Sequence, residues 1–319
     1  MNINDVKKVA VLGTGTMGSG LAQVFAAAGY KVQSYDISPK ALETSSTVIK
    51  TSLNTFVELG LMPESRIEEV LANIATTTSL EQAVGDADLI VEAIIEKIDA
   101  KKEIYQKVDA LCPANAVIAS NTSFLNIFEV MPERRQPNAA IAHFFAPAHI
   151  IPLVEVVKGE KTSEETVNML VDILRKADKV PVVMEKFVPG FCINRMQRII
   201  GREVFFLLDN GYITPENLDL AVKASLIPRA MVLGFVQRYD FTGLDLSAMN
   251  LENKGFLEAP HDNSPKSLFD RVKKGDYGVK TGKGFFDYSG RKMEEVLKKR
   301  DEELIRVFES VKDLIYKKI

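Results

Sequence analysis

Short apolar runs alternate with helical patterns from the start of the chain to about residue 187. The runs are rich in valine, isoleucine and alanine, and they lie at residues 8–13, 31–36, 73–78, 87–93, 116–120, 139–145, 152–159 and 179–185. Strands that alternate with helices are typical of a mostly parallel sheet covered by helices. The pattern therefore predicts an α/β domain over residues 1–187.

The pattern changes after the stretch VPGF at residues 188–191. Longer helical runs follow, such as residues 194–211, which end on a glycine suited to a helix C-terminus, and residues 291–319. We expect a second, all-helical domain over residues 188–319, with the boundary near Pro189.

The composition is that of an ordinary globular protein, with 46% hydrophobic and 26% charged residues, and a length of 319 residues favours two domains. A net charge of −3 gives no general attraction to nucleic acid or to an anionic membrane, so we expect small-molecule partners. Cys112 and Cys192 have no paired spacing and predict neither a disulfide nor a metal site. The sequence has no run typical of a signal peptide or a membrane span, which favours the cytoplasm.

Glycines cluster between the first apolar run and the helical pattern that follows it. Gly13 allows a tight turn, Gly15 lets backbone amides approach a pyrophosphate, and Gly18 lets helix and strand pack closely. Asp36, at the end of the next strand, can accept hydrogen bonds from an adenosine ribose and would repel a 2′-phosphate. In this register the motif predicts an NAD site, although a glycine-rich turn alone is weak evidence. The same cofactor-binding turn also contains Thr14, Thr16 and Met17.

His143 is one of three histidines and lies near the end of the apolar run at residues 139–145. Ligands gather at the carboxyl ends of such strands, where an imidazole could accept the proton that accompanies hydride transfer to NAD. Glu155, on the next apolar run, could hold the far ring nitrogen and stabilise the imidazolium. Taken singly, His143 is more often a structural residue, and Glu155 could be a solvated residue of an alternating strand.

Taken together, these features resemble the L-3-hydroxyacyl-CoA dehydrogenases over nearly the whole chain. The matching blocks occur in order and are GTGTMGSG, ADLIVEAIIEKIDAKK, ASNTSFL, HFFAPAHIIPLVEV, VPGFCINR and GVKTGKGFFDY. The resemblance implies a Rossmann-like, doubly wound first domain, a helical second domain that mediates homodimer formation, and NAD as oxidant. It also implies a catalytic His143–Glu155 pair, with Ser123 and Asn194 binding the reacting oxygen. By the same match, the cofactor or substrate contacts are Asp36, Glu96, Lys101 and Lys280.

Several of these residues also have simpler structural explanations. Ser123 follows the strand at residues 116–120, where its hydroxyl could bond a substrate oxygen or cap a helix. Asn194 starts a long helix, where it could cap that helix or reach across an interdomain cleft to the substrate. Glu96 and Lys101 could form a solvated helix face, and Lys280 could simply be exposed.

Departures from the family pattern bear on the substrate. Ala146 replaces the usual asparagine after HFF. Members that bind coenzyme A usually carry several lysines on the helix after the second strand, where lysines can meet phosphates. Here that helix has only Lys40 and Lys50, although Ser52 keeps a hydroxyl for the substrate.

The helical domain departs from the family as well. Its usual PMGP block is replaced by a segment that brings in Arg229 and Arg238. Arg229 resembles the arrangement in the L-gulonate dehydrogenase and lambda-crystallin branch, where the partner is a free carboxylate that a guanidinium can bind in a bidentate fork. The alternative for both arginines is a surface ion pair.

Three functions remain open at this point. The leading prediction is NAD-dependent oxidation of an L-3-hydroxyacyl-CoA, such as 3-hydroxybutyryl-CoA, in which His143 removes the hydroxyl proton. The second keeps this chemistry but uses a free 3-hydroxy acid anchored by Arg229. The third is a crystallin-like protein that binds NAD without turnover. A zinc alcohol dehydrogenase is disfavoured because two cysteines and three histidines barely supply its ligands.

Overall fold

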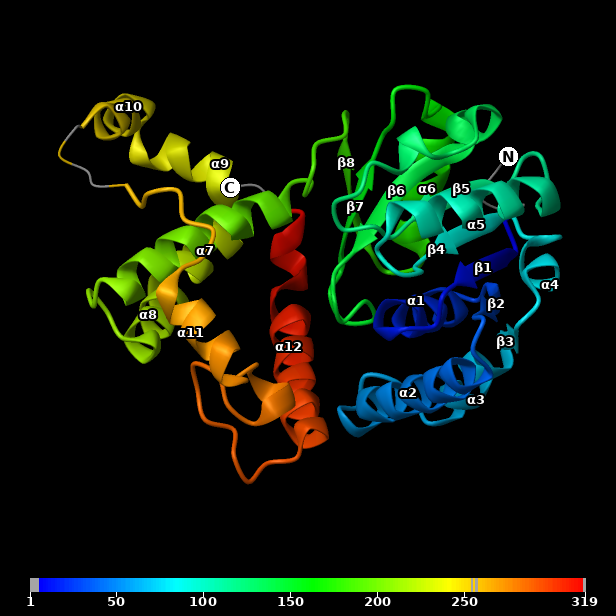
Figure 1. Ribbon diagram of the computed structural model, residues 1–319, viewed down its shortest axis with the longest axis horizontal. Helices are drawn as coiled ribbons and strands as arrows, with labels where there is room; N and C mark the ends of the chain where they lie inside the picture. The colour runs from blue at the N-terminus through cyan, green and yellow to red at the C-terminus, as the bar shows by residue number, and fades with distance from the viewer. Residues whose placement is uncertain (1–5, 254, 256–257, 318–319) are drawn as a thin grey trace. The chain divides into compact units, whose positions relative to one another are not determined.

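The computed structural model describes residues 6–253, 255 and 258–317 (Figure 1). The chain divides into two compact units, Met1–Arg195 and Met196–Ile319. The division falls inside helix α7 (Ile193–Asp209), a few residues beyond Pro189. The limits 1–187 and 188–319 expected from the sequence stay a prediction.

The first unit contains one eight-stranded sheet with the order β3-β2-β1-β4-β5-β6-β7-β8. All neighbouring strands are parallel except β6 and β7, which are antiparallel. The strands are β1 (Lys8–Leu12), β2 (Lys31–Tyr35), β3 (Ile74–Thr77), β4 (Leu89–Glu92), β5 (Val117–Ser120), β6 (Ala139–Phe144), β7 (Leu153–Val157) and β8 (Val180–Met184). Every apolar run singled out in the sequence is a strand, and the predicted Rossmann-like α/β fold is confirmed.

Helices cover both faces of this sheet because its inner strands β1, β4, β5 and β6 are buried on both sides. The helices of the first unit are α1 (Thr16–Ala27), α2 (Pro39–Glu58), α3 (Ser65–Ala72), α4 (Leu80–Val84), α5 (Ile98–Leu111) and α6 (Glu164–Lys176), with short 3₁₀ turns at Ile127–Glu129 and Glu133–Asn138. One core cluster joins α1, α2, α3 and α6 to one face of the sheet. A second cluster joins α4 and α5 to the opposite face.

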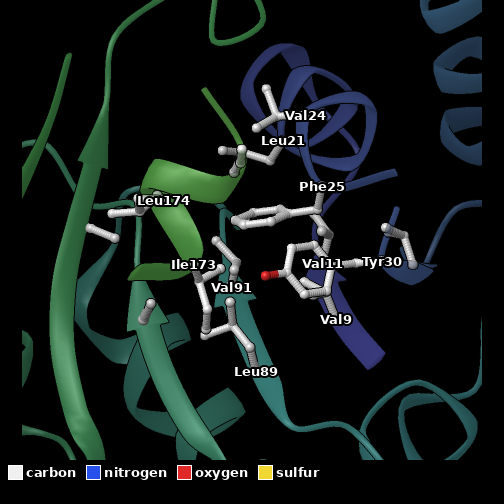
Figure 2. Packing of buried hydrophobic residues seen from close by; sticks show 14 of the residues in the cluster. Val9, Val11, Leu21, Val24, Phe25, Tyr30, Leu89, Val91, Ile173 and Leu174 are labelled. Atoms are coloured by element: carbon white, nitrogen blue, oxygen red, sulfur yellow. The ribbon is translucent and has the colours of Figure 1, made fainter. Parts of the chain in front are cut away.

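Phe25 of α1 is a central residue of the first cluster and is 1% exposed. Its ring meets that of Phe144 edge-on at 6.1 Å, which fastens the end of β6 to α1. Figure 2 shows Phe25 among side chains from α1, β1, β4 and α6. The helix that follows the glycine-rich turn is therefore held rigidly against the sheet.

The register of the strands sets the level at which the site can form. Leu12, Glu92 and Ser120 are neighbours across β1, β4 and β5, and Ile141 of β6 lies beside Ser120. Each of the first three residues ends its strand, whereas β6 continues past Ile141 to His143 and Phe144. At roughly 3.3 Å per residue, His143 lies about 7 Å beyond that row, toward the carboxyl edge of the sheet.

The second unit is helical, as predicted. Its elements are the remainder of α7, α8 (Pro215–Ala221), a π-helical turn (Val222–Leu226), α9 (Ile227–Thr242), α10 (Leu244–Glu252), α11 (Lys266–Lys274), a 3₁₀ turn (Val279–Thr281) and α12 (Met293–Ile315). Helix α9 is interrupted at Gly234, whose φ is 66°.

Few side chains of the second unit are buried. Among its described residues only Pro265 and Ile305 are buried. Helices α9 and α10 carry a group of exposed apolar side chains, namely Ile227, Val232, Phe235, Val236, Tyr239, Phe241, Leu244, Leu246, Met249 and Leu251. An apolar group of this extent is typical of a surface that another chain covers.

Candidate active site

The glycine-rich turn between β1 and α1 has the shape of a phosphate cradle. Gly13 has a φ of +90°, and a Cβ there would lie 2.6 Å from the carbonyl oxygen of Ala93. A Cβ on Gly18 would lie 1.8 Å from the carbonyl oxygen of Gly13, so only glycine fits at either position. Around Gly15 the space is open, and α1 begins there without a side-chain cap. Its first amides can therefore bind the pyrophosphate of NAD.

Asp36 lies directly after β2 and beside this turn. Its Oδ2 accepts hydrogen bonds from the Thr14 amide at 2.9 Å and the Thr14 hydroxyl at 3.1 Å, and its Oδ1 accepts from the Ser38 amide at 2.9 Å. The carboxylate is thus held next to the cradle, at the position where a ribose diol follows a bound pyrophosphate.

His143 and Glu155 are directly opposite each other on the antiparallel strands β6 and β7. Nδ1 of His143 lies 2.8 Å from Oε2 of Glu155. The two residues are only 4% and 1% exposed, so the alternative that Glu155 is a solvated strand residue is wrong. An ionised carboxylate can only accept, so the imidazole donates from Nδ1, and in the neutral imidazole Nε2 is then an acceptor.

The other oxygen of Glu155 holds the start of helix α7. Oε1 accepts hydrogen bonds from the backbone amides of Cys192 at 3.0 Å and Ile193 at 2.9 Å. Glu155, and not Asn194, therefore caps this helix. The carboxylate is fixed at both oxygens, and the positive end of the helix dipole faces its charge.

Asn194 and Ser123 lie close together within the first unit. The Asn194 side-chain amide donates a hydrogen bond to the carbonyl oxygen of Ser123 at 3.4 Å. Both residues belong to the unit that contains the sheet. Of the two alternatives for Asn194, a reach across an interdomain cleft is not needed to meet Ser123, because the first turn of α7 is part of the same unit as Ser123.

The loop that carries Ser123 is held by Glu96. Its Oε1 accepts hydrogen bonds from the Thr122 hydroxyl at 2.5 Å and the Ser123 amide at 2.7 Å. Lys101 lies 3.2 Å from the other oxygen of Glu96 and is 1% exposed. The two residues do not form a solvated helix face, since Glu96 precedes α5 and Lys101 is a buried residue of α5.

Glu92 is a buried residue of this region that the sequence analysis missed. Its carboxylate, at the end of β4, is 0% exposed and accepts hydrogen bonds from Lys101 at 2.6 Å, Tyr105 at 2.5 Å, Ser120 at 2.7 Å and the Ile94 amide at 2.9 Å. Burial, with the neighbouring Glu92 charge, raises the pKa of Tyr105 well above its usual range, so the phenol remains a donor. A carboxylate at the end of an apolar strand, nine residues before a lysine, was the only sequence signal.

Two further residues hold the segment around His143. The Asn121 side chain accepts a hydrogen bond from the Phe144 amide at 2.9 Å. Lys179 is 6% exposed, and its ammonium donates to the carbonyl oxygens of Ala148 at 2.6 Å and Ile151 at 3.1 Å, in the loop between β6 and β7. Burial lowers the pKa of Lys179 to about 8. Nothing in the sequence distinguishes this lysine from an ordinary residue at a strand start.

Three further predicted residues lie on other elements. Ser52 lies on α2, where its hydroxyl is buried without a hydrogen-bond partner among the described residues. In the second unit, Lys280 is exposed with its ammonium 5.0 Å above the Tyr277 ring, and Arg229 is exposed and donates to the Ser225 carbonyl oxygen at 3.3 Å. Arg229 forms no ion pair with any described residue, and its role and that of Lys280 stay predictions.

Comparison with known proteins assigns the chain to a family. Residues 8–187 match the NAD binding domain of 3-hydroxyacyl-CoA dehydrogenase, and residues 190–288 match its C-terminal domain. The chain belongs to the 3-hydroxyacyl-CoA dehydrogenase family. Like that family, it is an NAD-dependent oxidoreductase acting on CH–OH groups, which confirms the predicted family and cofactor.

Two known proteins are similar to nearly the whole chain. A probable 3-hydroxybutyryl-CoA dehydrogenase of Bacillus subtilis is 35% identical over 89% of this chain and 98% of its own length. A 5-formyl-3-hydroxy-2-methylpyridine 4-carboxylate 5-dehydrogenase of Mesorhizobium japonicum is 30% identical over 95% and 97%. A crystal structure of the latter kind of enzyme, described as an NAD⁺-dependent dismutase, has a TM-score of 0.85 at 28% identity and covers 96% of this chain and 99% of its own.

Neither a membrane span nor a metal cluster is found in the described part of the chain. None of its helices is both long and apolar enough to cross a bilayer. No group of three or more His, Cys, Asp or Glu side chains there could hold a metal ion.

Proposed function

We propose that the protein oxidises the hydroxyl-bearing carbon of an L-3-hydroxyacyl-CoA, such as 3-hydroxybutyryl-CoA, to the 3-ketoacyl-CoA, with His143 as general base. The observation that carries this proposal is the buried 2.8 Å contact between His143 Nδ1 and Glu155 Oε2 at the carboxyl edge of the sheet. A fixed imidazole with a free acceptor nitrogen at this edge lies on the side where ligands of such sheets bind.

Each polar residue of the site has a part in this chemistry. Bound NAD supplies the hydride acceptor. His143 Nε2 takes the hydroxyl proton, and Glu155 stabilises the imidazolium that forms. The Ser123 hydroxyl and the Asn194 amide hydrogen-bond the substrate oxygen as it becomes a carbonyl. Glu96 and Lys101 hold the Ser123 loop, which is supported by their contacts with Thr122, Ser123 and Glu92.

A second candidate substrate is a free hydroxy acid. The Mesorhizobium relative, whose name gives a pyridine 4-carboxylate as its substrate, matches 95% of the chain, and the similar crystal structure covers 96%. Helix α12 lies beyond residue 288, where the match to the C-terminal family domain ends. Arg229 supports the same candidate, because an exposed guanidinium that forms no ion pair with any described residue could bind a carboxylate.

A substrate screen separates these candidates. NADH absorbance should be followed with purified protein, NAD and either 3-hydroxybutyryl-CoA, 3-hydroxybutyrate, L-gulonate or a hydroxymethyl pyridine carboxylate. Turnover of the thioester alone supports the first candidate. Activity confined to free acids rejects the thioester. Loss of that activity in Arg229→Met, with NAD affinity unchanged, would support Arg229 as the residue that binds the substrate carboxylate. NAD binding without turnover of any of these compounds would place the substrate outside both candidate classes.

The assembly and location of the protein are further proposals. We infer a homodimer formed through the second unit, supported by the exposed apolar side chains of α9 and α10. We also infer a cytoplasmic location, supported by Cys112 and Cys192, which are both free.

A further inference from the structure

The turn before helix α7 contains a residue in an unusual backbone conformation. Phe191 has a φ of +52°, and it and Asp178 are the only described residues other than glycine with a positive φ. A bulky side chain is disfavoured in this left-handed region, and such a conformation persists only where the surroundings hold it. Residues in this conformation are often found at functional sites, and Phe191 lies next to one.

The side chain of Phe191 is anchored in the core. It is 0% exposed and belongs to the cluster that joins α4 and α5 to the sheet. Its ring meets that of Phe187 edge-on at 6.0 Å, and its amide donates a hydrogen bond to the Val188 carbonyl oxygen at 2.9 Å. Packing on several sides therefore fixes both the ring and the turn.

The same side chain packs against the imidazole of His143. The ring centroids of Phe191 and His143 are 5.2 Å apart, and Phe145 lies 4.5 Å from His143. With Nδ1 bonded to Glu155, the two aromatic rings restrict rotation of the imidazole. The ring of Phe191 thus contributes directly to the orientation of Nε2.

The backbone of Phe191 acts on the partner of the imidazole. The next two amides, of Cys192 and Ile193, donate to Glu155 Oε1 at 3.0 and 2.9 Å. Because the left-handed residue sets the direction of the chain just before them, its conformation aims both N–H groups at one oxygen. With Oε1 held in this way, Oε2 is turned toward His143 Nδ1.

We propose that Phe191 is a positioning residue for the His143–Glu155 pair, acting through its ring on the imidazole and through its backbone on the carboxylate. The proposal rests on the proposed function, since it assumes that this pair carries out the proton transfer. A residue that only filled the core would affect stability and leave the orientation of the pair unchanged.

Two substitutions remove the aromatic ring from this turn. Phe191→Gly keeps the left-handed turn without strain and removes the ring, whereas Phe191→Leu keeps an apolar side chain without an aromatic face. We expect kcat to fall by about 10- to 100-fold in both, because a displacement on the order of 1 Å at a reacting group can cost about 10²-fold. The KM and the affinity for NAD should change little. Phe187→Leu is the control, because it loosens the same core without removing a ring packed on His143.

A spectroscopic measurement tests the orientation directly. An imidazole N–H bonded to a buried carboxylate should give a far-downfield proton signal in the free enzyme, assigned by its absence in His143→Gln. We expect the signal to be lost or moved in both Phe191 variants and retained in Phe187→Leu. If Phe191→Leu folds and keeps both the signal and kcat, Phe191 only fills the core and the proposal is wrong.

The outcomes also distinguish this proposal from the proposed function. Full activity in His143→Gln removes the base and overturns the proposed function, whatever Phe191 does. An inactive His143→Gln together with fully active Phe191 variants overturns only the positioning role. Should Phe191→Gly not fold, Phe191→Leu alone decides, because leucine retains most of the apolar contact.

Discussion

The two units of the chain distribute their polar and apolar groups in opposite ways. The first unit buries ionisable side chains, among them Glu92, Lys101, His143 and Glu155, each with a hydrogen-bond partner. In the second unit, Pro265 and Ile305 are the only described residues that are buried, and ten apolar side chains of α9 and α10 are exposed. Burial fixes polar groups in defined positions, which chemistry requires, whereas exposed apolar groups are stabilised only when another surface covers them.

The largest effect is expected from the buried imidazole. His143→Gln removes the proposed base, so the rate should fall by about 10²- to 10⁴-fold while NAD affinity stays nearly unchanged. Stopped-flow or steady-state NADH absorbance and NAD titration measure the two quantities. The matched control is His261→Gln, since His261 is exposed in the second unit. An active His143→Gln would remove the histidine from the mechanism.

A buried ion pair should contribute more to the free energy of unfolding than an exposed one. Lys101→Met leaves Glu92 buried without its cationic partner, so the free energy of unfolding should drop by about 3–5 kcal/mol. Lys107 is on the same helix but forms an exposed pair with Glu103, so Lys107→Met should leave stability nearly unchanged. Urea denaturation followed by circular dichroism compares the stabilities of the two variants. Equal losses of stability would show that burial of the Lys101–Glu92 pair makes no difference.

The pH dependence of stability should reveal Lys179. Its folded pKa of about 8 is below its ordinary value, so the unfolded chain holds more protons between about pH 8 and 10.5. The cost of burying the ammonium is fully present below pH 8 and is relieved as pH rises. Relative to Lys179→Met, the native protein should therefore gain ~2 kcal/mol from about pH 7.5 to about pH 9.5. If plots of stability against pH for the two proteins run parallel over this range, Lys179 does not titrate between these pH values.

The smallest change in chain stability is expected on the exposed surface of the second unit. Val236 of α9 is 84% exposed, so Val236→Asp should alter the stability of the isolated chain by less than about 0.5 kcal/mol. It should nevertheless shift the protein from dimer to monomer in analytical ultracentrifugation, because a charge would enter the proposed interface. Val48→Asp, on an exposed apolar residue of the first unit, is the control. An unchanged dimer in Val236→Asp would place the interface elsewhere.

The strands and the glycine-rich turn were predictable because their signals are local. Apolar runs of the right length, glycines at fixed spacing and an acidic residue at the end of the next strand depend only on neighbouring residues. The Glu92 network and the Lys179 contacts were not predictable. They join residues 9 to 31 positions apart whose types, a glutamate after a strand or a lysine before one, are common on protein surfaces.

By itself the sequence determined the α/β class, the helical second unit, the NAD motif and the family, since periodicity and ordered motifs are written along the chain. Only the tertiary structure decided that β7 runs antiparallel to β6, which sets Glu155 directly opposite His143. It likewise decided that the first turn of α7 closes on the same carboxylate. Both depend on how distant segments pair and pack, and a one-residue change of register would have turned Glu155 to the opposite face of the sheet.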